Sequence, residues 1–202
     1  MATQLSVVND CLAIMGEAPL NVLTEDHSFK QSALNTLERV DKGVQAKDWW
    51  YNMERHTLRR NVADGRVYFP TDMGTMVAGS CLNKYVQRGR VLYDLEAGSN
   101  VFPEGFELKV ILKRRIPLED VPVSVADYIA RRTVLEFQQE YDGDQTKTRN
   151  LKDEVYGVPG VTLGLKGEAS AEHIRNRKIN LIANSERLSR VTNVVNYSRR
   201  PR

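Results

Sequence analysis

The spacing of apolar residues changes twice along this chain of 202 residues, and this change constrains the fold more than any other feature of the sequence. Towards both ends, apolar residues recur every three or four positions, which is the spacing of an amphipathic helix. In the middle, aromatic and β-branched residues alternate with polar ones between glycine turns, which is typical of strands. We therefore predict an α+β fold: a helical bundle of two N-terminal helices and a long C-terminal helical hairpin, with a small antiparallel β-sheet between them.

Local signals set the bounds of these elements. Thr3 is a candidate N-cap and Gly16 a stop signal for the first helix, and residues 142–144, Asp-Gly-Asp, break the last helical pattern into a hairpin. The expected core, residues 1–156, has helices over 4–15 and 28–47, a sheet over 50–113, and helices over 124–141 and 144–156.

Two hairpins and a last strand are expected within the sheet. Residues 63–66 contain an Asp-Gly pair and separate two candidate strands, 57–60 and 67–69. Arg88 and Gly89 separate the next pair of strands in the same way. The last strand, residues 106–112, carries its apolar side chains on one side.

A glycine-rich stretch follows the last helix of the core. Residues 157–167 hold four glycines and one proline, which a continuous helix would accommodate only at a large cost. The stretch lacks the spacing of a phosphate-binding P-loop. We predict an extension loop over 157–167, followed by a returning helix and a basic C-terminal tail over 168–202. The apolar side chains of this loop are candidate contacts with another subunit: Val158, Val161, Leu163 and Leu165.

The positive charge of the chain is concentrated at its C-terminal end. The formal net charge is +3, but residues 166–202 hold nine basic and three acidic residues, a net of +6, which leaves −3 for the rest. Such a segment favours contact with nucleic acid or with an acidic protein surface. Candidate contact residues there are Ser198, Arg199, Arg200 and Arg202. Arg88 and Arg90, at the tip of a predicted hairpin, are candidate contacts with another protein.

The residues that could carry chemistry lack the spacing that chemistry requires. Cys11 and Cys81 are seventy positions apart, and the three histidines, His27, His56 and His173, are scattered, so neither a disulfide framework nor a metal site is predicted. Three carboxylate pairs fall in predicted turns, where acids usually cap helices: Glu25/Asp26, Glu119/Asp120 and Asp142/Asp144. We expect no catalytic residue, no cofactor and no metal, and therefore no enzyme.

Two further features have mainly structural interpretations. The aromatic cluster Trp49-Trp50-Tyr51 could stack nucleic-acid bases, but two tryptophans at a helix-to-strand junction are more often core residues. No apolar run approaches the roughly 18 to 20 residues that span a bilayer, so no membrane contact is expected.

One segment of the sequence is distinctive enough to indicate a family. Residues 5–19, LSVVNDCLAIMGEAP, resemble the opening of the T7-like tail tubular A proteins, head-to-tail adaptors of short-tailed bacteriophages, with the pattern L-S-x-V-N-D-x-L-A-x-x-G-E-x-P. Residues 49–52 resemble the G-W-x-F-N junction of that family, with Asp48 in place of glycine. Residues 84–94 resemble its Y-V-x-R-G-x-x-Y-D hairpin, with one residue more between Gly89 and Tyr93. The resemblance covers about the first 140 residues.

This resemblance implies a structural virion protein. Its subunits would form a ring, usually dodecameric, between the portal protein and the tail nozzle (tubular B) protein, near a tail fibre, with double-stranded DNA passing through its centre without sequence specificity. The expected location is the head-to-tail junction of the virion, after assembly in the cytoplasm of the bacterial host. The loop and the C-terminal tail would then contact neighbouring subunits or the portal.

Two other functions remain open from the sequence. Some members of this family have been proposed to hydrolyse envelope polysaccharide or peptidoglycan, although no residue pattern here locates such a site. A free DNA-binding protein that uses its basic tail is the other alternative.

Overall fold

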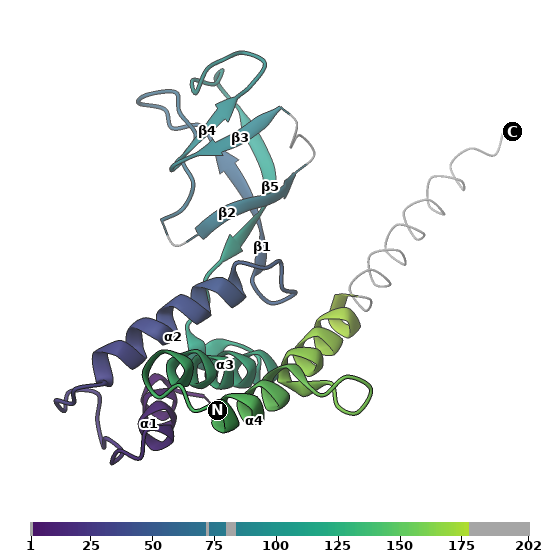
Figure 1. The fold of residues 1–202 in the computed structure, drawn as a ribbon. Helices are drawn as coiled ribbons and strands as arrows, with labels where there is room; N and C mark the ends of the chain where they lie inside the picture. Colours follow the sequence, from purple (N-terminus) through teal and green to yellow (C-terminus); the bar gives the residue numbers. More distant parts are fainter. Residues whose placement is uncertain (1, 72, 80–83, 178–202) are drawn as a thin grey trace, which may run out of the picture.

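The helices and strands separate into two units with separate hydrophobic cores, a helical unit and a β unit that projects from it (Figure 1). The computed structural model describes residues 2–71, 73–79 and 84–177. No helix in these ranges is long and apolar enough to cross a membrane. The predicted α+β class is confirmed.

The helical unit is built around α3 (Val123–Tyr141), which contacts α1 (Gln4–Ile14), α2 (Lys30–Gln45) and α4 (Gln145–Tyr156). A short 3-10 helix, η1 (Leu118–Asp120), precedes α3, and a further helix is described over residues 164–177. Thr3 caps α1 as predicted, because its side chain accepts a hydrogen bond from the backbone N–H of Ser6. The largest fully buried side chains here include Tyr128, Phe137, Leu12 and Ile129.

The β unit contains two antiparallel sheets. β1 (Met53–Arg59), β5 (Glu107–Arg114) and β2 (Met73–Gly79) form one sheet with β5 in the centre, and β3 (Tyr85–Arg88) pairs with β4 (Val91–Asp94) in the other. Leu58 lies opposite Leu108, and Val110 and Leu112 follow on the same side of β5, where all four are buried. Leu92 and Phe102 close this core from the other side.

The first predicted hairpin is wrong and the second is confirmed. Residues 57–60 and 67–69 share only one isolated bridge, Arg60 with Val67, whereas β1 pairs with β5 along its full length. The physical reason is that β5 offers eight residues with an alternating apolar side, whereas the 67–69 segment is too short to cover β1. Residues 67–69 instead run beside β4, where Val67 accepts a hydrogen bond from the N–H of Leu92 (2.9 Å).

The glycine-rich stretch is shorter as a loop than expected. Residues 157–163 form the loop, and the helix that follows begins at residue 164, so it includes Gly167. Glycine inside a helix costs about 1 kcal/mol relative to alanine. Leu165 and Ala169, one helical turn apart, both pack on the core of the helical unit and offset that cost.

The joint between the two units is a polar network around the buried side chain of Gln45. Its Nε2 donates to the backbone carbonyl of Ile116 (2.8 Å) and to Oδ1 of Asp41 (2.7 Å), and its Oε1 accepts from the N–H of Ile116 (2.8 Å). Asp41 in turn binds Arg115 across 2.7 Å. Asn52, also buried, donates to the carbonyl of Gln45 (2.9 Å). The end of α2 is therefore tied to both chain segments that lead into and out of the β unit.

Cys11 is fully buried in the core of the helical unit, as expected of a packed, reduced thiol. Burial, with a smaller effect of the Asp10 charge, raises the pKa of its thiol to about 12. Cys81 lies outside the described residues. The folded state therefore holds the Cys11 thiol in its neutral form over a wide range of pH.

We expect the substitution Gln45→Ala to lower the free energy of unfolding by about 1–3 kcal/mol, because it leaves buried polar partners without hydrogen bonds. Gln31→Ala is the matched control: Gln31 is in the same helix but exposed, with one hydrogen bond to Asn35. Its expected effect is below about 0.5 kcal/mol. Urea unfolding followed by circular dichroism measures both, and equal losses would contradict the role of the joint.

We also expect the thiol of Cys11 to make stability fall at alkaline pH. Above about pH 8.5 the unfolded chain loses the thiol proton while the folded chain keeps it, so the free energy of unfolding decreases as the pH rises. The slope from this group is at most about 1.4 kcal/mol per pH unit. Urea unfolding of Cys11→Ala between about pH 9 and about pH 11 should show a shallower decrease than the unsubstituted protein. Identical slopes would show that the thiol does not titrate differently in the two states.

Candidate functional site

The loop over residues 157–163 is closed at its base by two glycines that face each other. A Cβ atom built on Gly157 would lie 2.2 Å from the carbonyl oxygen of Thr162, and one built on Gly164 would lie 2.2 Å from the backbone nitrogen of Gly157. Both glycines also have positive φ angles, 80° and 63°. Only glycine, which has no side chain, allows the two ends of the loop to approach this closely. We call residues 157–163 the closed loop.

Hydrogen bonds inside the closed loop hold its shape. The backbone N–H groups of Val161 and Thr162 both donate to the carbonyl of Val158, at 2.9 and 3.0 Å. The hydroxyl of Thr162 accepts a hydrogen bond from the N–H of Val158 (3.0 Å). Figure 1 shows the loop standing out from the helical unit beside the last described helix. The loop is thus a structured projection of this unit.

The closed loop carries two apolar side chains outward. Val161 is 77% exposed and Leu163 68% exposed, so these two predicted contact residues lie on the surface. Val158 is half-buried, and Leu165 packs on the core of the helical unit rather than on the loop surface. Of the four predicted contact residues, only Val161 and Leu163 are therefore exposed enough to contact a partner.

The helix over residues 164–177 extends this apolar surface. Gly167 lies against Leu163, because a Cβ on Gly167 would be 2.8 Å from the Cβ of Leu163. Ile174, seven residues after Gly167 and so on the same side of the helix, is 53% exposed. Closed loop and helix together present an apolar surface at one side of the helical unit.

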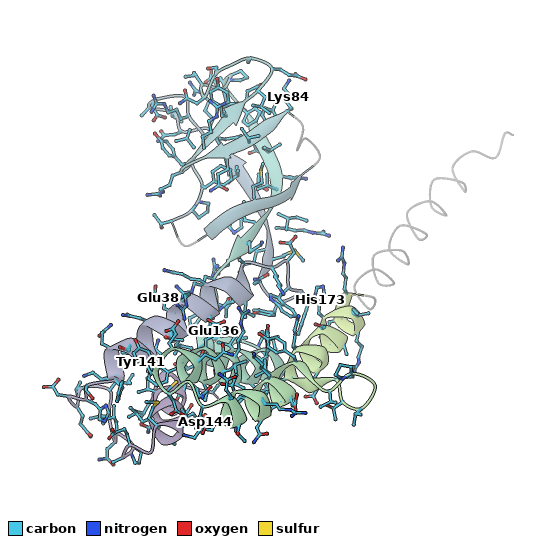
Figure 2. All side chains as sticks on the ribbon, in the orientation of Figure 1. Glu38, Lys84, Glu136, Tyr141, Asp144 and His173 are labelled. Atoms are coloured by element: carbon cyan, nitrogen blue, oxygen red, sulfur yellow. The ribbon has the colours of Figure 1, made fainter. Side chains whose placement is uncertain are left out.

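The opposite side of this helix meets the aromatic cluster of residues 49–51, which packs on the core of the helical unit. His173 contacts the rings of Trp49 and Trp50, with centroids 5.5 and 5.9 Å apart, and Figure 2 shows it where the helix approaches the segment after α2. Burial, followed by the positive charge of Arg177, lowers the pKa of His173. Trp49 is buried and donates from its indole N–H to Val44, so the core interpretation of this cluster is confirmed. The contact of His173 with this cluster was not predicted, although Leu165, Ala169 and His173 have the spacing of one helix face.

The two predicted arginines lie at the turn between β3 and β4. Arg88 and Arg90 are exposed on either side of Gly89, which has a φ of 61°. The guanidinium of Arg88 lies over the ring of Tyr93 at 3.6 Å from its centroid. The turn therefore presents two cations, one of them held by an aromatic ring. Ser198, Arg199, Arg200 and Arg202 lie outside the described residues.

A basic surface that sequence analysis did not single out lies on the β unit. Along β1 and β5, every second side chain points away from the buried core, and Arg55 and Lys109 are exposed among them. The alternation of residues along each strand already indicated which side chains share a face. That these two faces form one surface follows only from the pairing of β1 with β5, which was not predicted.

The three carboxylate pairs were predicted to be caps, and this is confirmed for Asp144 but not for Glu119 and Asp120. Asp144 caps α4 by accepting hydrogen bonds from the N–H groups of Thr146 and Lys147. Asp142 pairs with Lys147 (2.9 Å), which lowers the pKa of Asp142. Glu25 accepts from the N–H groups of residues 21 and 22, and Glu119 and Asp120 are exposed in η1. No group of histidine, cysteine and acidic side chains within the described ranges could hold a metal ion.

Comparison with known proteins places this architecture in a family. The family model for tail tubular protein matches residues 5–155, which span α1 to α4 and end just before the closed loop. No curated protein matches the chain. Because the family model covers well over half of the sequence, the chain belongs to the tail tubular protein family and is a structural protein of a bacteriophage tail.

Proposed function

We propose that this chain is a subunit of a head-to-tail adaptor ring, which joins the portal protein to the tail nozzle and encloses part of the path of the DNA. Membership of the tail tubular protein family supports this assignment. The observation that carries it further is the closed loop, whose shape is held by its own hydrogen bonds while Val161 and Leu163 remain exposed. Such side chains cost free energy in water unless a partner covers them.

A ring requires contacts between two different surfaces of the same chain. Head-to-tail contacts generate closed rings when the rotation between neighbours closes, and each copy then offers one surface on each side. The closed loop and Ile174 supply one apolar surface at one side of the helical unit. In the proposed dodecamer, this surface packs against the neighbouring subunit or the portal.

The distribution of charge supports a ring that surrounds DNA without gripping it. A channel that neutralised many phosphates in each of its copies would hold DNA tightly, because these contacts add together around a ring. Residues 1–165 have a net charge of −3, and the positive charge is concentrated in residues 166–202. We propose that Ser198, Arg199, Arg200 and Arg202 lie towards the portal.

The β unit is proposed to face the tail nozzle and the fibres. Arg88 and Arg90 form an exposed turn in this unit, and the unit projects away from the helices (Figure 1). A projecting unit with its own core can reach a second ring while the helical unit packs against its neighbours. No described carboxylate pair favours the alternative of a hydrolase.

Light scattering tests the ring. We expect the purified 23.0 kDa chain, mixed with the portal protein of the same phage, to form a complex larger than the portal by many copies of the chain. Electron microscopy of the complex counts the copies. A chain that stays monomeric beside the portal but binds DNA in a salt-sensitive manner would overturn the adaptor proposal and favour a DNA-binding protein.

The closed loop provides a second test. The double substitution Val161→Asp and Leu163→Asp should weaken ring formation at least about tenfold, because it places charges in an apolar contact. Val62→Asp is the control, since Val62 is 86% exposed but lies in the β unit, and it should assemble like the unsubstituted chain. Equal assembly of all three proteins would show that the loop makes no contact in the ring. Circular dichroism confirms that each variant is folded.

A further inference from the structure

The two units of this chain carry opposite net charges. Residues 53–114, which form the β unit, contain ten basic and seven acidic residues, a net of +3. The segments 2–52 and 115–177, which form the helical unit as the structure describes it, contain thirteen basic and eighteen acidic residues, a net of −5. The β unit is thus basic and the helical unit acidic, and each has its own core.

Part of the positive charge of the β unit lies on the face of the sheet that points away from the core. Leu58, Leu108, Val110 and Leu112 point to the core side of the sheet, where β3 and β4 also contribute. The neighbouring positions in β1 and β5 point to the opposite side, and this outer face comprises Met53, Arg55, Thr57, Arg59, Glu107, Lys109, Ile111 and Lys113. Four of these eight residues are basic and one is acidic.

Two cations of the outer face have no partner in the described part of the chain. Arg59 pairs with Glu107 across 2.9 Å, and Lys113 pairs with Asp48 across 2.6 Å. Arg55 and Lys109 make no ion pair and no side-chain hydrogen bond within the described residues. Arg55 lies opposite Ile111 and Lys109 lies opposite Thr57, so the two cations are diagonal neighbours on adjacent strands. Diagonal positions are about 7–8 Å apart, and two like charges there repel each other unless an anion approaches.

We propose that the outer face of the sheet in one copy binds the acidic helical unit of a second copy. This inference rests on the proposed ring and names one of its contacts. The opposite net charges of the two units supply the complementarity, which favours this orientation of neighbours and disfavours contact between like units. The β unit projects from the helical unit (Figure 1), and Arg55, Thr57 and Lys109 of its outer face are exposed. Arg55 and Lys109 then gain acidic partners that the described part of their own chain does not provide.

The composition of the outer face favours a protein over DNA. Ile111 is half-buried and Thr57 exposed between the cations, and Glu107 adds a carboxylate that phosphates would repel. Binding to a phosphate backbone relies on many cations without such interruptions. A mixed surface with two free cations around apolar atoms is typical of a contact between proteins.

A double charge reversal tests the contact. Arg55→Glu with Lys109→Glu should weaken assembly of the chain, alone or with the portal, at least about tenfold at low salt. The difference from the unsubstituted chain should shrink as salt rises towards about 1 M, where the Debye length is about 3 Å. Sedimentation velocity measures both. The matched control is Arg66→Glu, which makes the same change in net charge as either single reversal, Arg55→Glu or Lys109→Glu. Arg66 is exposed in the β unit but lies off the outer face, so this variant should assemble normally.

Zero-length crosslinking identifies the partner surface directly. Carbodiimide treatment of assembled chains, half of them labelled with nitrogen-15, should join Lys109 of one chain to a carboxylate of segment 2–52 or 115–177 of another. Lys109→Arg keeps the charge but removes the amine, so it should lose this crosslink and still assemble. Loss of the crosslink with normal assembly of this variant would show that the crosslink forms through the Lys109 amine, while the contact needs only the positive charge.

Several results would overturn the inference. Normal assembly of the Arg55→Glu and Lys109→Glu variant would do so while leaving the ring intact, and so would crosslinks of Lys109 only within its own chain. Loss of DNA affinity without loss of assembly would assign the outer face to DNA. A chain that assembles neither alone nor with the portal would contradict the ring and this contact together.

Discussion

The structure depends on one buried glutamine that joins two bodies with separate cores. Gln45 makes hydrogen bonds in both directions with Ile116 and a third with Asp41, which holds Arg115. Only two chain segments pass between the helical unit and the β unit. Where they pass, directional hydrogen bonds of Gln45 and Asn52, shielded from water, tie them to the end of α2. The projection of the β unit, and with it every contact proposed for that unit, follows from this joint.

A fixed joint is useful in a protein that works by assembly. A tail protein of this family has to present several surfaces to different neighbours at the same time, and each surface must keep its direction. Here the closed loop points out from the helical unit, while the turn of Arg88 and Arg90 and the outer face of the sheet belong to the β unit. Apolar contact at the closed loop and charge complementarity at the outer face of the sheet would act in different ways. Apolar burial supplies free energy, and charge selects the orientation of the neighbour.

The candidate surfaces could be predicted from the sequence only in part. Glycine spacing predicted a projecting loop, because glycine is unfavourable inside a helix, but Gly164 and Gly167 belong to the helix that follows. It could not tell that Gly157 and Gly164 face each other, or that Leu165 turns inward while Val161 and Leu163 remain outside. Exposure of a side chain depends on which distant elements pack beside it, and the local sequence does not determine that packing.

The order and type of the elements were determined by the sequence, since helical and alternating spacing are local properties with local physical causes. The N-cap at Thr3, the turn at Gly89 and the apolar side of β5 were all correct for this reason. The pairing of β1 with β5 was decided only by the tertiary structure, because it joins segments nearly fifty residues apart and depends on which strand covers the most apolar surface. The same holds for the docking of His173 on Trp49 and for the joint at Gln45. These contacts form between distant segments, where packing rather than local spacing selects the partner.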